Sequence, residues 1–214
     1  MDTADGNAGD RAPQGRAGYR RSTGSRRGEA RRRDLLERVI DDLAVNGLVD
    51  FSLRRAARSA GTTHKVLLYY FDGADDLLKQ AIPRLRERRI GNALAAAQHP
   101  GCRTLASRVR AMWSALLDAT SGLRTLDQAI GLAMYDPERY GEFGRDASKQ
   151  YLPALLSLCP ENWTDERRLQ VAEMILAVLR GFLVDWLTSG ETAGVEAGFE
   201  ALVRALEREE AADA

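Results

Sequence analysis

Residues 35–61 read LLERVIDDLAVNGLVDFSLRRAARSAG, and residues 62–71 read TTHKVLLYYF. Leucine, valine and isoleucine recur every three or four residues between positions 35 and 43, and charged residues occupy the positions between them. This period predicts an amphipathic helix. The dipeptide Asn46-Gly47 predicts its end, because both residues tolerate the left-handed backbone angles of a helix C-cap.

Two much shorter helices are predicted after this stop. Ser52 is placed to cap a helix that Gly61 ends after about two turns. One of the threonines at 62 and 63 can cap the next helix, and an Asp-Gly pair ends it. A helix of two turns is not stable alone, so its neighbours must present it, and a presented short helix fits the major groove of DNA. The pattern is typical of a helix-turn-helix, although a small helical bundle with tight turns would give the same pattern.

Composition limits the fold class. Only 7% of the 214 residues are aromatic, and alanine, leucine and arginine dominate, a mix that favours helix over sheet. Alternating runs of Val, Ile, Thr and Tyr are absent, which argues against a β-sandwich or barrel. The chain is therefore predicted to be all-α, with a three-helix N-terminal domain followed by a larger helical domain.

Longer helices are predicted in the second part. The expected ranges are 75–89 (extending toward 97), 104–119, 123–135, 144–158, 165–188 and 194–209. Pro83 is expected to kink the first of these helices. Pro137 and Gly141 are expected to interrupt the chain before 144–158, and Thr164 to cap the helix that follows it.

Charge is distributed unevenly along a chain of zero net charge. Up to Arg33 there are nine arginines against four acidic residues, and the chain after Phe71 carries the compensating negative charge. Residues 1–30 contain almost no large apolar side chain, so they are predicted to form a disordered arginine-rich arm. Such asymmetry is expected when one end of a chain meets a polyanion, although basic tails are also common without that role.

The stretch from residue 35 to 82 resembles the N-terminal domain of the TetR family of transcriptional regulators. It carries the two strings quoted above followed by DGADDLLKQAI, in the order and spacing of the family. The match covers about a quarter of the chain. After the arm at 1–30 that the composition predicts, the resemblance implies a helix-turn-helix DNA-binding domain at 31–78 and a helical ligand-binding and dimerisation domain at 79–214.

The resemblance also implies the DNA-contacting residues. The residues expected to contact base edges or phosphates are Ser52, Arg54, Thr63, His64, Lys65, Tyr69 and Tyr70. Lysine can donate to guanine or phosphate, and tyrosine hydroxyls can donate to phosphate. Tyr70 has a competing role in the core, and Arg55 and Arg58 are expected to be solvated. Leu68 and Ala74 depart from the family, because they replace phosphate-contacting residues. The arginine-rich arm is hypothesised to compensate by reaching a minor groove.

A regulator of this family binds a small effector inside the larger domain. Methionine and aromatic side chains suit an adaptable apolar pocket, although any single one of them can equally be plain core. The predicted lining residues are Met112, Trp113, Leu116, Leu126, Met134, Tyr135, Phe143, Tyr151, Met174, Phe182 and Trp186. Asp127, Gln128 and Gln150 are candidate polar anchors.

By the same analogy, the last two long helices are expected to form a homodimer as a four-helix bundle. The predicted interface residues are Leu176, Leu179, Leu183, Leu187, Phe199, Leu202 and Leu206, with Gly181 permitting close approach. Two recognition helices related by a two-fold axis imply a palindromic operator. Repression is the usual mode of the family, and an apolar effector is expected to release the operator by moving the recognition helices apart, with Pro83 stiffening the linking helix.

Other classes of protein are less well supported. The chain has no G-x-S-x-G, H-E-x-x-H, P-loop or G-x-G-x-x-G motif, so no enzyme activity is expected. With two separated cysteines and two histidines, no metal site or cofactor is expected. The most apolar stretch, 171–187, contains three charged residues, which argues against a membrane span, and a cytoplasmic location is expected. The remaining alternative is a helical ligand-binding or protein-interaction module that has lost DNA binding.

Overall fold

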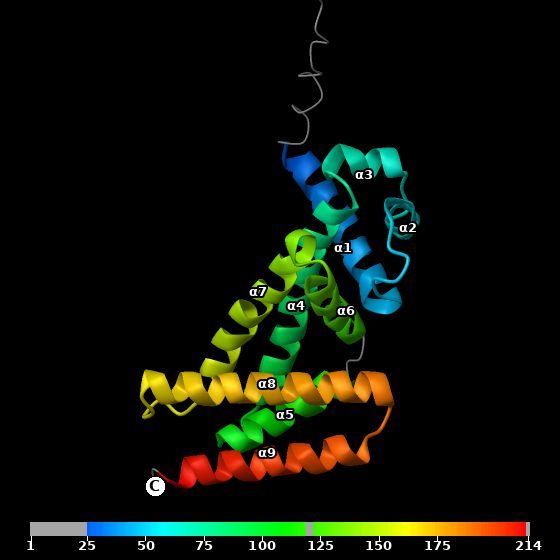
Figure 1. Cartoon of the computed structure of the whole chain (residues 1–214). Coiled ribbons are helices and arrows are strands. Elements are labelled where there is room, and N and C mark those ends of the chain that lie inside the picture. The colour runs from blue at the N-terminus through cyan, green and yellow to red at the C-terminus, as the bar shows by residue number, and fades with distance from the viewer. Residues whose placement is uncertain (1–24, 119–121, 213–214) are drawn as a thin grey trace, which may run out of the picture.

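A computed structural model describes residues 25–118 and 122–212, and the predicted arm at 1–24 lies outside these residues. The described chain is all-helical, as predicted (Figure 1). Its helices are α1 (Arg26–Asn46), α2 (Leu53–Ser59), α3 (His64–Tyr70), α4 (Ala74–Ala97), α5 (Leu105–Asp118), α6 (Leu123–Tyr135), α7 (Pro137–Leu156), α8 (Asp165–Ser189) and α9 (Ala193–Ala211). Within the described residues, no helix is both long and apolar enough to cross a membrane.

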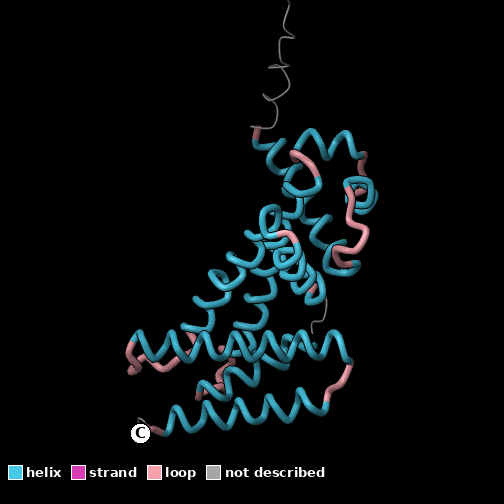
Figure 2. The backbone as a smooth tube through the Cα atoms, viewed as in Figure 1, coloured by secondary structure: helices cyan, strands magenta, loops and turns pink. Residues whose placement is uncertain are grey.

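Two hydrophobic cores organise these helices. The first joins α1, α2 and α3 to the start of α4 and also contains Leu126 and Ala129 of α6 and Phe143 of α7. We call α1, α2, α3 and the start of α4 the head, and this core the head core. The second joins the end of α4 to α5, α8 and α9 and to the end of α7, and we call this part the body. Figure 1 shows the head at one end and α8 and α9 crossing the other end, with α4 and α7 running between them. Short loops connect most of the helices (Figure 2).

Local capping explains the helices of the head. The Ser52 hydroxyl accepts a hydrogen bond from the Arg55 amide at 3.2 Å, and the Thr63 hydroxyl accepts one from the Val66 amide at 3.3 Å. Each hydroxyl satisfies an amide that the first turn leaves without a partner, so the serine and the threonine each start a helix where the sequence predicts. Gly61 separates the two helices with a positive φ of 62°.

Three boundaries differ from the predictions. Helix α1 begins at Arg26, so the predicted arm is wrong for residues 26–30, where the Ser25 hydroxyl caps the helix. The boundary between residues 78 and 79 falls inside the continuous helix α4. Pro137 does not interrupt the chain but begins α7, because proline has no amide hydrogen and the first helical position needs none.

Candidate DNA interface and ligand cavity

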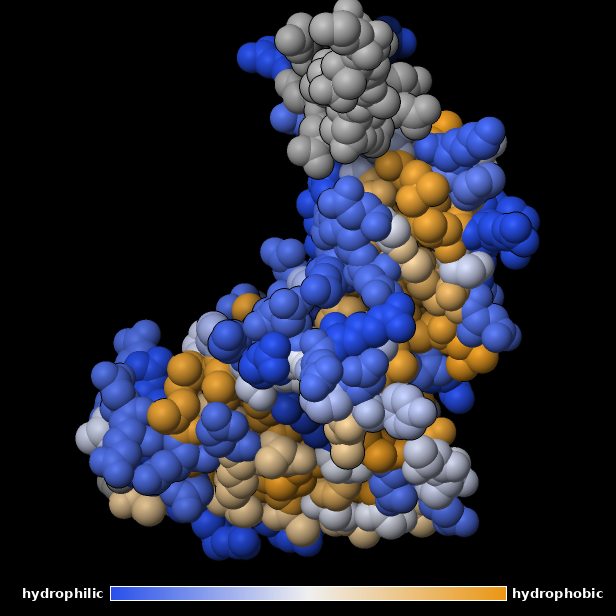
Figure 3. Space-filling view, turned by 45° about the horizontal axis from the view of Figure 1, so that its top comes forward, coloured by the Kyte–Doolittle hydropathy of each residue, from blue (hydrophilic) through white to orange (hydrophobic). Residues whose placement is uncertain are grey.

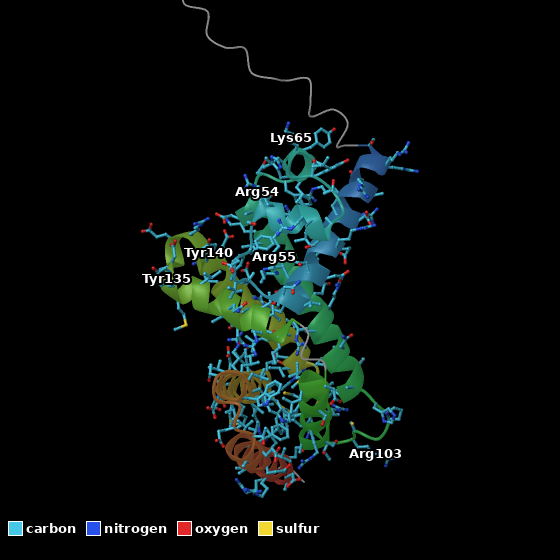
Figure 4. All side chains as sticks on the ribbon, turned by 90° about the vertical axis from the view of Figure 1, so that its right-hand side faces the viewer. Arg54, Arg55, Lys65, Arg103, Tyr135 and Tyr140 are labelled. Atoms are coloured by element: carbon cyan, nitrogen blue, oxygen red, sulfur yellow. The ribbon has the colours of Figure 1, made fainter. Side chains whose placement is uncertain are left out.

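The head presents α3 and the start of α2 at the end of the molecule. His64, Lys65 and Arg54 are exposed, and within the described residues neither Arg54 nor Lys65 forms an ion pair. Figure 4 shows both cations at this end, far from the loop that carries Arg103. Unpaired surface cations that share one end of a domain can contact phosphates, which is the sequence-independent part of DNA binding.

The other predicted DNA residues have mixed roles. The hydroxyls of Ser52 and Thr63 serve as helix caps, as described above. Tyr69 and Tyr70 are partly buried, with ring centroids 4.8 Å apart in an edge-to-face arrangement. Tyr70 packs against the head core, which agrees with its competing role there. Leu68 is 49% exposed, so this departure from the family pattern lies on the surface of α3.

Arg55 is a structural residue, and the expectation that it is simply solvated is wrong. Its Nε donates to Asp42 at 2.9 Å, and its terminal nitrogens donate to the carbonyls of Val49 at 2.7 Å and Gly47 at 2.8 Å. The side chains of the Arg55–Asp42 pair are only 14% and 9% exposed. This residue therefore fastens α2 to the loop that follows α1.

Arg32 holds α3 from its other end. Its Nε donates to the Tyr70 carbonyl at 3.3 Å, and its Nη2 donates to Gln80 Oε1 at 2.6 Å. The same guanidinium lies 5.0 Å from the centroid of the Phe71 ring. The sequence places Arg32 in a basic run, and nothing in that run distinguishes it from its exposed neighbours Arg31 and Arg33.

A cavity lies in the body between α4, α5, α6, α7 and α8. The cavity has a volume of about 70 Å³, counted as the space that the centre of a water molecule can reach. Its lining residues are Arg86, Arg89, Ile90, Ala93, Leu94, Met112, Leu116, Leu123, Leu126, Asp127, Ile130, Tyr151, Ala154, Leu155, Leu176, Leu179, Arg180 and Leu183. The wall is mostly apolar with a few polar side chains, as is usual in sites for small molecules.

Some of the predicted pocket residues lie in the wall of this cavity. Met112, Leu116, Leu126, Tyr151 and the proposed anchor Asp127 line the cavity. The prediction is wrong for Met134 and Tyr135, which are 80% and 89% exposed because they end α6 away from the core. Figure 4 shows Tyr135 on the outside of the molecule.

The remaining predicted pocket residues pack elsewhere. Phe143 belongs to the head core and stacks on Tyr140, with ring centroids 5.8 Å apart. Trp113 stacks on Phe199 at 5.1 Å and also contacts Phe182, so this aromatic group fills the space between α5, α8 and α9. Met174 and Trp186 are partly buried against the body core without lining the cavity.

Two further predicted anchors bind other partners. Gln150 accepts a hydrogen bond from Arg86 at 2.6 Å and therefore supports the cavity wall from behind. Gln128 accepts a hydrogen bond from the Leu48 amide at 2.7 Å, so it links α6 to the loop after α1. The Gly122 amide donates to the Ala44 carbonyl at 2.8 Å in the same region.

The predicted dimer residues do not face outward. Six of them are buried within a single chain, because α8 and α9 pack their leucine-rich faces inward. These six are Leu176, Leu179, Leu183, Phe199, Leu202 and Leu206. Leu187 is partly buried against the same core. The exposed residues of α8 and α9 instead include Ala177, Gly181, Val184, Ala197 and Ala201, together with charged residues such as Glu173, Asp185, Glu196 and Arg204. Figure 3 shows apolar residues among polar ones over the lower part of the molecule, where these helices lie.

Comparison with known proteins supports the fold. No family model matches the chain. A curated relative, the HTH-type transcriptional regulator BetI 1 of Chromohalobacter salexigens, is 27% identical over 96 residues, which are 45% of this chain and 47% of that protein. The match thus spans about half the length of the curated relative.

Solved structures match over most of the chain. A transcriptional regulator from Pseudomonas aeruginosa PAO1 has a TM-score of 0.62 and 22% identity, covering 88% of this chain and 95% of that one. A TetR-family regulator from Rhodococcus sp. has a TM-score of 0.63 and 15% identity, covering 83% and 97%. The multidrug binding protein EbrR complexed with proflavin has a TM-score of 0.60 and 21% identity, covering 81% and 98%. The chain therefore has the fold of the TetR-family transcriptional regulators.

Proposed function

We propose that the protein is a TetR-type transcriptional regulator that binds DNA through the head and a small effector in the body cavity. One observation carries the proposal: α2 and α3 present the exposed cations Arg54 and Lys65, which form no ion pair with any described residue, at one end of a molecule that encloses a mostly apolar cavity. The same fold in regulators, and in a protein crystallised with proflavin, supports both halves of it.

We propose a homodimer that uses the outer faces of α8 and α9. Ala177 and Gly181 are one helical turn apart on α8, and Ala197 and Ala201 are one turn apart on α9. Small residues let two helices approach closely, and Val184, 49% exposed, would gain burial beside them. A two-fold axis through this surface would pair two heads and make the preferred operator palindromic.

Gly181 offers a test of this dimer. A Cβ added to it meets no atom within 4 Å, so Gly181→Glu leaves the protomer unstrained but places a charge in the proposed interface. Gly91 of α4 is exposed and equally open, so Gly91→Glu is the matched control. Sedimentation velocity is expected to show a dimer for the wild type and the control, and a monomer for Gly181→Glu. A dimer that survives Gly181→Glu contradicts this interface.

Effector binding is proposed to act through α6. The inner side of this helix lines the cavity through Leu126 and Asp127, and its other side bonds to the end of α1. The Thr125 hydroxyl donates to the Leu43 carbonyl, next to the bond between Gln128 and Leu48. A ligand that shifts α6 would therefore shift the head. Coupling between the two sites then requires that the ligand bind one position of α6 more tightly than the other. In this proposal the protein represses transcription while it is bound to the operator, and the effector relieves repression by releasing it.

DNA binding is tested by fluorescence anisotropy on duplexes from the upstream region of the gene, across a range of salt, against scrambled duplexes. Arg54→Ala is expected to weaken binding and to lower the slope of log affinity against log salt by about 1 for each phosphate that the variant no longer neutralises. Arg103→Ala removes an exposed arginine at the opposite end and should change neither quantity. Binding no better than to scrambled DNA would favour the alternative, a ligand-binding module without an operator.

A further inference from the structure

The cavity contains an unusual number of cations. Arg86 and Arg89 on α4 are 1% and 6% exposed, and Arg180 on α8 lines the same space. Charged side chains are almost never buried to this extent unless a partner of opposite charge compensates them. Among the residues that line the cavity, Asp127 is the single carboxylate. Three guanidinium groups therefore face one acidic group.

Arg180 has donors without acceptors. Its Nη1 lies 3.3 Å from the Ser148 hydroxyl, but its Nε and Nη2 are buried and have no hydrogen-bond partner within the described residues. The guanidinium lies 5.5 Å from the centroid of the Tyr151 ring. A buried donor without a partner costs stability, so an acceptor is expected at this place. Nε and Nη2 donate from the same edge of the planar group, which is the edge that binds a carboxylate with two parallel hydrogen bonds.

Asp127 can offset only one of these three positive charges. Its Oδ2 is buried and has no hydrogen-bond partner in the part of the chain that the structure describes. Burial raises the pKa of this carboxyl to about 6, although Arg89 and Arg180 act in the opposite direction. Arg86 donates to two neutral groups, Gln150 Oε1 and the Phe143 carbonyl, the latter at 3.1 Å, and Arg89 donates to the Leu116 carbonyl at 3.1 Å. The cavity therefore keeps an excess of positive charge.

We infer that the ligand of the cavity is a small organic anion, namely a carboxylate with an apolar body. The unpartnered edge of Arg180 would bind the carboxylate, and Arg86 and Arg89 would add positive potential. The body would pack against apolar side chains such as Leu94, Met112 and Leu123. This inference rests on the proposed function, and it replaces the purely apolar effector that the sequence predicts.

The test compares ligands that share a body and differ in the head group. Isothermal titration calorimetry is run on the full-length protein with benzoate, benzyl alcohol and benzylammonium, and with hexanoate, hexan-1-ol and hexylammonium. In each series the carboxylate is expected to bind at least tenfold more tightly than the alcohol, and the ammonium ion not at all. Equal affinity across a series, preference for the ammonium ion, or no binding of either carboxylate would overturn the inference.

Variants assign the effect to Arg180. Arg180→Gln should weaken carboxylate binding by about 10- to 100-fold, the value of a hydrogen-bonded charge, and leave the affinity for the alcohol nearly unchanged. Arg168→Gln is the control, because Arg168 is on the same helix and also has a buried Nε without a partner among the described residues, but lies outside the cavity. If Arg180→Gln fails to fold, Arg180→Lys keeps the charge without the two-donor edge and should give an intermediate loss. Carboxylate affinity that neither Arg180 substitution lowers would overturn the assignment.

DNA affinity is measured separately with and without saturating hexanoate. Carboxylate binding that leaves DNA affinity unchanged would contradict the proposed coupling but not the ligand class. DNA binding that responds to an ammonium ligand and not to a carboxylate would contradict the ligand class but not the proposed function.

Discussion

The buried ion pair between Arg55 and Asp42 is expected to decide whether the head folds. Arg55→Met keeps most of the volume of the side chain but removes the guanidinium. Asp42 then keeps one described partner, the Asn46 amide at 2.8 Å, and the carbonyls of Gly47 and Val49 lose their donor. Breaking a buried pair from one side costs about 3–5 kcal/mol, a large part of the roughly 5–15 kcal/mol that stabilises a typical domain. At about 2–4 °C per kcal/mol, the melting temperature should fall by about 6–20 °C.

Two spectroscopic signals separate the head from the body in this experiment. The three tryptophans are Trp113, Trp163 and Trp186, and all pack in the body core, so fluorescence follows the body. Far-UV circular dichroism follows the helices of both parts. In urea, Arg55→Met should lose part of its dichroism before its fluorescence changes. Arg54→Met is the matched control, because its side chain is exposed and without an ion pair among the described residues, so its stability should stay within about 0.5 kcal/mol of the wild type. An Arg55→Met protein as stable as this control would refute the reasoning.

Three further perturbations have expected outcomes. Gly47→Ala should lower the free energy of unfolding, measured in urea, by about 1–3 kcal/mol. The reason is that Gly47 has a φ of 71° and that a Cβ there would lie 2.7 Å from the Gln128 side-chain oxygen. The control Gly91→Ala should be neutral or stabilising. Asp127→Asn should be more stable than the wild type, by a margin that grows from about pH 4.5 to 7. The pKa of this carboxyl is about 6 in the folded protein and about 3.9 in the unfolded chain, so ionising the buried group costs the wild type stability as pH rises. A margin independent of pH would contradict the assignment. Arg32→Met should weaken DNA binding by releasing the end of α3 while the body melts as before, and unchanged anisotropy would show that α3 needs no such support.

The starts of α2 and α3 could be predicted because their signals are local. The hydroxyls of Ser52 and Thr63 accept hydrogen bonds from amides three residues away, and Gly61 itself adopts the positive φ of the turn. The residues close in sequence are therefore enough to predict where these helices begin. The role of Arg55 could not be predicted in this way because its partners lie 6 to 13 residues back, near the C-terminal end of α1 and in the loop that follows it. The start of α7 at Pro137 could not be predicted for a different reason, since a proline can both stop one helix and start the next.

The cavity could be predicted less well because methionine and aromatic side chains indicate an apolar pocket, whereas three of the lining residues are arginines. A signal was present in α4, where Ile82, Arg86, Arg89, Ala93 and Ala97 follow one another at intervals of three or four residues. This spacing puts both arginines on the face that carries the apolar residues, and all five side chains are buried. Arg180 gave the same signal within the most apolar stretch of the chain. A charge in the middle of an apolar helical face indicates a buried functional group as readily as an interruption of the face.

The predicted dimer residues are buried within a single chain because one apolar face can be covered in two ways. The leucines of α8 and α9 are as periodic as a bundle interface requires, but in the fold they cover α5 and the cavity of their own chain. The residues left outside include small ones among charged ones, and sequence patterns undervalue the small residues because each buries little area. Such a surface can still support tight helix contacts, since close approach of the backbones replaces the area that larger side chains would bury.

The arrangement of α6 ties the separate inferences together. One side of the helix carries Asp127 into a cavity with excess positive charge, and the adjacent residue Gln128 bonds to the loop after α1. That loop also provides the carbonyls that Arg55 binds, and Arg55 belongs to α2, which contacts α3. A ligand anion that drew Arg180 and α6 into new positions would thus act on the loop that fixes the two helices of the DNA-binding motif. The contacts form a continuous chain from the cavity to α3, and the coupling needs no larger rearrangement than a shift of α6 against α1.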